Sequence, residues 1–148
     1  MKQLFYLLFF LTACNPSKNE EFTSKQEKSS ILIDSTRIEV INKTKEVMDV
    51  HDFAMEKMGE MVKLKKSLQV LKTTTDTSQH KLINKTILDL EDADKIMWDW
   101  MHGYKTAIVD TSSIEVALEY LADQKIKVDI VDFKIKESVN NGYELIEN

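Results

Sequence analysis

Glycine and proline interrupt helices and shape turns, and this chain of 148 residues has only three glycines and one proline. A β-sandwich or barrel of this length would need many more turn residues. The one proline, Pro16, lies close to the N-terminus and leaves the rest of the chain without another. The composition therefore predicts an all-α protein that is built from long helices with few connections.

Apolar side chains recur every three or four residues in three long stretches, as they do on one face of a helix. The first stretch covers residues 37–72 and follows Thr36-Arg37-Ile38-Glu39, which has the form of a capping box. Lys43 and Lys57 interrupt its heptad pattern, whose apolar positions are Val40, Val47, Val50, Ala54, Met61, Leu64, Leu68 and Leu71. The polar residues 73–78 predict a turn, in which Asp76 or Thr77 caps the next helix.

The second and third stretches repeat this pattern. The second ends near Gly103 and has as its apolar positions Ile83, Leu90, Ala93, Met97, Trp100, Met101 and Tyr104. The third follows a second capping box, Ser112-Ser113-Ile114-Glu115, and frays near residues 140–142. Its apolar positions are Ile114, Leu118, Leu121, Val128, Val131, Ile135 and Val139. Short connections make neighbouring helices antiparallel, so we expect an up-down-up three-helix bundle, or long coiled coil, over residues 31–148.

Residues 1–13 have the layout of a secretory signal peptide that ends beside a cysteine. Lys2 precedes an apolar run, residues 4–11, that is too short to span a bilayer. Leu11-Thr12-Ala13-Cys14 resembles the lipobox of bacterial lipoproteins, which implies cleavage before Cys14 and lipid on its thiol. The alternative is an ordinary signal peptide with a chance cysteine. Because two or more acyl chains anchor a protein stably, we expect membrane attachment in the cell envelope.

The segment after Cys14 has a different character. Residues 15–30 contain one aromatic and no aliphatic side chain, so we expect residues 14–30 to form the lipidated N-terminus and a flexible tether. Within them, Lys18-Asn19-Glu20-Glu21 weakly resembles the charged signal that sends some Bacteroidetes lipoproteins to the cell surface. We therefore expect the protein in the outer membrane, on its periplasmic face or at the surface.

Composition also excludes several classes of function. A single cysteine allows no internal disulfide, no CxxC pair and no thiolate metal site. The net charge of −5 argues against nucleic acid as a partner. The chain has no P-loop, no GxGxxG and no nucleophile matched to a base, and Asp99-x-x-His102 alone does not make a di-iron site. His80 should be solvated in the first turn of its helix. We expect no enzymatic activity, and the oligomeric state stays open.

Methionine is the unusual residue of this sequence. Six of its seven methionines lie in two stretches, beside His51 and His102, namely Met48, Met55, Met58, Met61, Met97 and Met101. If the hairpin turns near residues 75 and 76, equal rise on both helices places His51 beside Trp100 and Met101, and Met55 beside Met97. The candidate site, which we call the Met/His layer, consists of His51, Met55, Met58, Met97 and Met101. Its possible flanking residues are Trp98, Trp100 and His102.

Three interpretations of the Met/His layer are open. Methionine commonly fills irregular gaps in a core, and the packing interpretation is favoured for that reason. In it, His51 donates to a carboxylate such as Asp94 or to a backbone carbonyl. Alternatively, thioethers and imidazole bind Cu(I) or Ag(I), with a tryptophan face adding cation–π attraction. A third interpretation is a Met-rich groove that accepts a helix of a partner protein.

Two motifs give the chain a family resemblance. They are Val47-Met48-x-x-His51-Asp52-x-x-Met55-x-Lys57-Met58 and Ala93-Asp94-x-x-Met97-x-x-Trp100-Met101-His102, and Tyr120-Leu121 before a lysine-rich helix also fits. With them the chain resembles a family of small Bacteroidetes lipoproteins that are often labelled "viral A-type inclusion protein". The resemblance implies a lipoprotein with a helical fold and assigns no activity.

Overall fold

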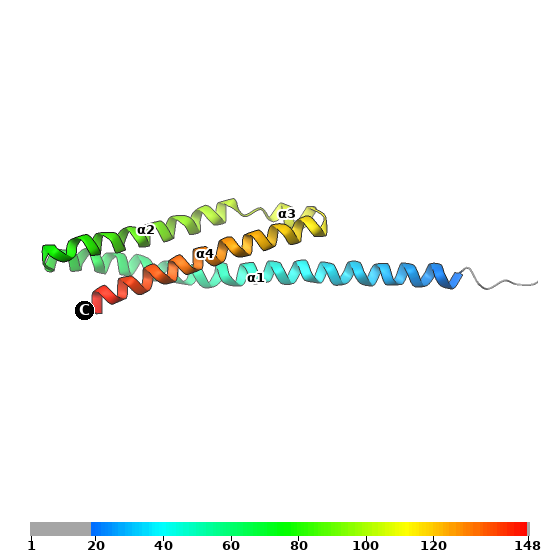
Figure 1. Ribbon diagram of the computed structural model, residues 1–148, viewed down its shortest axis with the longest axis horizontal. Coiled ribbons are helices and arrows are strands. Elements are labelled where there is room, and N and C mark those ends of the chain that lie inside the picture. Colours follow the sequence, from blue (N-terminus) through cyan, green and yellow to red (C-terminus); the bar gives the residue numbers. More distant parts are fainter. Residues whose placement is uncertain (1–18, 148) are drawn as a thin grey trace, which may run out of the picture. The chain divides into compact units, whose positions relative to one another are not determined.

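A computed structural model of the chain describes residues 19–147, with side chains from Ser35 onward. Those residues form helices and their connections, with no strand among them (Figure 1). The elements are α1 (Asn19–Thr74), a 3₁₀-helix η1 (Thr77–Gln79), α2 (His80–Gly103), α3 (Thr106–Thr111) and α4 (Ile114–Glu147). The predicted all-α class is confirmed. No helix in this part of the chain combines the length and the apolar character that crossing a membrane requires.

Helix α1 begins at Asn19, well before the expected start at Arg37. Residues 19–30, which were expected in the flexible tether, are therefore helical. The physical reason is that glutamate, lysine and glutamine are good helix formers, and neither glycine nor proline follows Pro16 before Gly59. Thr36 lies inside α1 and is not a helix N-cap, so the first predicted capping box is wrong.

The chain divides into two units at residues 35 and 36. Residues 1–18, which include the predicted signal peptide and Cys14, lie outside the described residues.

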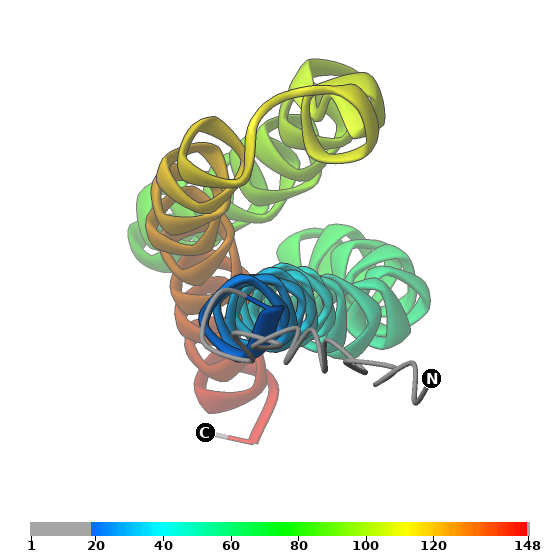
Figure 2. The same ribbon diagram turned by 90° about the vertical axis from the view of Figure 1, so that its right-hand side faces the viewer.

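The second unit is a bundle of three helices, formed by residues 36–74 of α1 together with α2 and α4. In it, α2 and α4 lie side by side in both views (Figures 1 and 2). The predicted seam is confirmed, since its central positions are buried. They are Val47, Ala54, Met61, Leu64 and Leu68 on α1, Ile83, Leu90, Ala93, Met97 and Trp100 on α2, and Leu121, Val128, Val131, Ile135 and Val139 on α4.

Contacts between helices give their directions. His51 of α1 lies against Trp100 of α2, and further along α1 Lys65 pairs with Glu91 at 3.3 Å, so residue numbers rise on one helix and fall on the other. On α4, Lys136 lies over the Phe53 ring at 4.6 Å, and Tyr143 bonds Glu60, so these numbers rise together. The up-down-up topology is thus the one expected.

Three polar residues occupy buried seam positions that the apolar pattern skipped, Thr86, Gln124 and Ser138. The Thr86 hydroxyl donates to the Leu82 carbonyl at 3.1 Å, and the Ser138 hydroxyl donates to the Ile135 carbonyl at 3.0 Å. The Gln124 side-chain amide donates to the Asp123 carboxylate at 3.1 Å. Each polar group finds a partner on its own helix, which is why the seam tolerates it without a cross-helix hydrogen bond.

The connections differ from prediction in detail. Asp76 accepts a hydrogen bond from the Ser78 amide at 2.8 Å, and this bond lowers the pKa of Asp76. Asp76 therefore caps the 3₁₀-helix η1, which leads into α2. Helix α2 ends at Gly103 as expected. Helix α3 was not predicted, because a six-residue helix that buries no residue leaves no apolar period in the sequence.

The last helix is longer than expected. At its start, the Val116 amide donates to the Ser113 hydroxyl at 3.4 Å, so Ser113 is the capping residue of the Ser112-Ser113 pair. The predicted fraying near residues 140–142 is wrong, since α4 continues to Glu147. Gly142 is buried against Leu64 of α1, and this close approach holds the last turns of α4 on the bundle.

Candidate functional site

The Met/His layer lies where α1 and α2 pack against each other. Met97 is fully buried, while Met55, Met58 and Met101 are half-buried and pack against the core that contains Met97. The ring of His51 lies 5.5 Å from the ring of Trp100, between centroids. This contact agrees with the register predicted from the hairpin. The four thioethers of the layer are thus all part of, or next to, the packed core.

His51 has a partner that the sequence analysis did not name. Its Nδ1 lies 2.8 Å from the carboxylate of Asp52, the next residue of α1, and not beside Asp94. A contact between consecutive residues depends on their rotamers, which helical spacing does not determine. With Nδ1–H donating to this carboxylate, the Nε2 lone pair of His51 stays available as an acceptor or as a metal ligand.

An aromatic row continues from His51 across the bundle. Trp100 and Tyr104 lie 5.4 Å apart, and Tyr104 and Tyr120 lie 5.7 Å apart, so the row joins α1, α2 and α4. Burial raises the pKa of Tyr104. The Tyr120 hydroxyl accepts a hydrogen bond of 2.5 Å from the Lys105 amide, just before α3. The indole N–H of Trp100 is buried without a hydrogen-bond partner among the described residues.

Trp98 and His102, two of the expected flanking residues, pair with each other on the exposed side of α2. Trp98 is half exposed, and the two rings lie 5.8 Å apart. His102 Nδ1 lies 2.7 Å from the Trp98 carbonyl oxygen, one turn back along the helix. Of the two tryptophans, Trp100 is therefore the one that stacks on His51.

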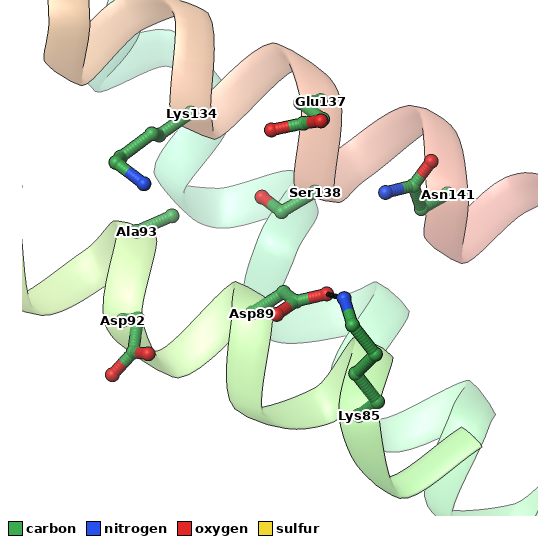
Figure 3. A pocket seen from close by; sticks show the side chains of 8 residues that line it. All are labelled: Lys85, Asp89, Asp92, Ala93, Lys134, Glu137, Ser138 and Asn141. Atoms are coloured by element: carbon green, nitrogen blue, oxygen red, sulfur yellow. Dashed lines mark hydrogen bonds and ion pairs between the residues drawn. The ribbon is translucent and has the colours of Figure 1, made fainter. Parts of the chain in front are cut away.

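A small polar groove lies between α2 and α4, with a volume of about 130 Å³ (Figure 3). Its lining residues are Lys85, Asp89, Asp92, Ala93, Lys134, Glu137, Ser138 and Asn141. Lys85 and Asp89 form an ion pair of 2.6 Å along α2, which raises the pKa of Lys85. Side chains of both signs line the groove, so it favours no ligand of one charge.

Titratable side chains are spread over the surface of the bundle. Residues 35–147 contain no group of three histidine, cysteine, aspartate or glutamate side chains that could hold a metal ion. His80, which was expected to be solvated, is half-buried, and its Nε2 has no hydrogen-bond partner within this part of the chain.

The sequence analysis missed a more apolar groove, between α1 and α3. It has a volume of about 410 Å³ and is lined by Arg37, Val40, Ile41, Thr44, Lys45, Val109 and Asp110. A shallow hollow also lies on the outer face of α4, lined by Ile126, Asp129, Ile130, Phe133 and Lys134. The sequence signal for both was a set of isoleucines that lie off the seam positions of their helices, of which Ile41 and Ile126 are 62% and 64% exposed.

Comparisons of the chain with protein-family models, with curated proteins and with solved structures find no match.

Proposed function

We propose that this protein is a non-enzymatic, lipid-anchored binding protein of the cell envelope, held in the outer membrane. The observation that carries the proposal is Leu11-Thr12-Ala13-Cys14 at the end of a short apolar run, because this arrangement suits lipidation of Cys14. The resemblance to Bacteroidetes lipoproteins, which rests on the two Met/His motifs, supports the same location.

The arrangement of residues 35–147 supports a binding role over a catalytic one. General acid–base catalysis needs titratable groups within reach of one reacting atom. Most ion pairs in this region instead join neighbouring side chains on the surface of a single helix. Apolar side chains, by contrast, are exposed on the outer faces of the helices, including Ile41, Ile130 and Phe133. Where exposed apolar side chains adjoin, as Ile130 and Phe133 do in the hollow on α4, they support a role in contact with another molecule.

Lipid anchoring is tested by replacing Cys14 with serine. The Cys14→Ser chain should lose labelling by a radioactive fatty acid and leave the membrane fraction. The matched control is the double variant Cys14→Ser/Ser17→Cys, which keeps one thiol but moves it away from Ala13, and it should stay unlabelled as well. Wild-type labelling or wild-type membrane recovery of Cys14→Ser would contradict the proposal.

A second candidate function is sequestration or delivery of Cu(I) or Ag(I) by the Met/His layer. The support for this function is the position of His51. Its Nδ1 bonds the carboxylate of Asp52, its ring lies against Trp100, and its Nε2 is left for a ligand. Thioether sulfur and imidazole nitrogen suit soft monovalent metals, and the half-buried Met55, Met58 and Met101 lie at the edge of the core.

Silver separates this candidate from simple packing. A metal that binds the folded state raises its melting temperature, so Ag(I) should stabilise the wild type but not the Met55→Leu/Met97→Leu variant. Without metal, each substitution should cost less than about 1.5 kcal/mol, because leucine conserves the volume. Met61→Leu, a buried position on α1 outside the layer, is the control and should keep the response to silver. A wild-type melting curve that excess Ag(I) does not move would exclude the metal site and leave the binding protein standing.

A further inference from the structure

The groove between α1 and α3 has an apolar floor that continues the core. Val40 of α1 and Val109 of α3 are half-buried and pack against the core cluster, while Ile41 beside them is 62% exposed. The Thr44 hydroxyl donates to the Val40 carbonyl at 2.8 Å, so this side chain needs no polar partner from a ligand. The volume of about 410 Å³ lies within the range of roughly 300–1,000 Å³ that is usual for small-molecule sites.

The lining of this groove also carries two cations. Arg37 forms no ion pair with another residue that the structure describes, although it lines the groove. Lys45 pairs with Asp49 at 2.5 Å, but both side chains are largely exposed, and such surface pairs contribute little. One carboxylate, Asp110, lines the groove from α3. A ligand with an apolar body and one anionic end would match both the apolar floor and the guanidinium of Arg37.

We propose that the groove between α1 and α3 binds a fatty acid, with its alkyl chain on Val40, Ile41 and Val109 and its carboxylate on Arg37. Guanidinium and carboxylate are matched in geometry, since two parallel N–H···O bonds can join them. The groove has room for one acyl chain, which favours a free fatty acid over a phospholipid with two. This site is separate from the Met/His layer and does not depend on lipidation of Cys14.

Helix α3 is the element that such a ligand would stabilise. It has six residues, buries none of them, and forms one wall of the groove through Val109 and Asp110. A short helix with so few buried contacts opens easily, and its amides exchange rapidly with solvent. A bound acyl chain covers Val109, so occupancy should slow hydrogen exchange in residues 106–111 and leave the exchange of α2 unchanged.

The test uses lauric acid below its micelle concentration and the full chain with Cys14→Ser, which carries no acyl group of its own. Calorimetric titration should give saturable binding of one fatty acid per chain, with slower exchange in α3. Ile41→Asp should weaken binding by about tenfold or more. The substitution places a negative charge, the same sign as that of laurate, against the apolar chain of the ligand. Ile126→Asp is the matched control, since Ile126 is equally exposed on α4, and it should bind as the parent does.

Charge is tested separately from apolar contact. Arg37→Gln should weaken binding of laurate by about tenfold, the loss expected for one charge-assisted contact, and Asp110→Asn should strengthen it. Dodecyltrimethylammonium, which has the same chain and a positive end, should bind the parent weakly.

Equal binding of both amphiphiles, equal effects of Ile41→Asp and Ile126→Asp, or no saturable binding of laurate would each overturn the proposal. An acidic amphipathic peptide that slows α3 exchange where laurate does not would assign the groove to a protein partner instead. Because membrane attachment is measured apart from laurate binding, failure here leaves the proposed anchoring intact.

Discussion

Two of the three helical glycines of the bundle, Gly59 and Gly142, have opposite surroundings. Gly59 lies on the exposed side of α1, and a Cβ built there meets no other atom within 4 Å. Gly142 of α4 faces Leu64, and a Cβ there would overlap Leu64 Cδ2 and lie 2.8 Å from its Cγ. At Gly59 the missing side chain thus only destabilises α1. At Gly142 it is required, because α4 could not otherwise pack against Leu64.

The same substitution at these two positions should have opposite effects on stability. Gly59→Ala should raise the free energy of unfolding by about 0.5–1 kcal/mol, because alanine loses less backbone entropy in a helix. Gly142→Ala should lower it by about 1–3 kcal/mol, because the new methyl group pushes Leu64 out of place. Urea unfolding followed by circular dichroism measures both. Stabilisation by Gly142→Ala would show that α4 does not approach α1 as closely as described.

At the Met/His layer, the sequence predicted the contact between His51 and Trp100 because the hairpin register determines which residues face each other. It could not predict that His51 takes Asp52 as its partner, or that Trp98 and His102 pair on the exposed side. Those contacts depend on rotamers and on small rotations of the helices. Neither changes the spacing of apolar residues.

Helix ends were predicted less well than helix faces. The apolar period identifies the buried face of α1, α2 and α4, but it does not tell where a helix begins. Helix α1 therefore begins at Asn19 without a signal other than its helix-forming composition. Helix α3 was missed for a related reason, since none of its residues is buried. The groove between α1 and α3 could not be predicted without it.

The start of α4 offers a direct test of capping. Ser113→Ala should destabilise the protein by about 1 kcal/mol, because the Val116 amide loses its side-chain acceptor. Ser112→Ala is the control, since the Val116 amide bonds the hydroxyl of Ser113 and not that of Ser112, and it should change stability by less than about 0.5 kcal/mol. Thermal unfolding measures both variants. A larger loss with Ser112→Ala would mean that the capping box predicted from the sequence is the one in use.

At the scale of the whole bundle, α1 and α4 are parallel neighbours without a direct connection. Their register is held by the closeness of Gly142 to Leu64 and by a polar contact on the surface. The Tyr143 hydroxyl donates to Glu60 Oε1 at 2.8 Å, and Lys57 Nζ donates to Glu60 Oε2 at 2.8 Å. These side chains lie on separate helices, outside the apolar seam. Hydrophobic periodicity therefore did not predict their contact.

This contact should make part of the stability depend on pH. The hydrogen bonds from Lys57 and Tyr143 lower the pKa of Glu60 below its ordinary value of 4.5. A lowered pKa in the folded state means stability that is present above that ordinary value and is lost as the pH falls through the lowered pKa.

Tyr143→Phe removes one of the two donors. The difference in unfolding free energy between wild type and Tyr143→Phe should be largest near neutral pH and should shrink in acid. Urea unfolding across this range measures it. In a Glu60→Gln background, where no carboxylate titrates, Tyr143→Phe should have the same effect at every acidic pH, and a pH dependence that persists there would assign it to another group.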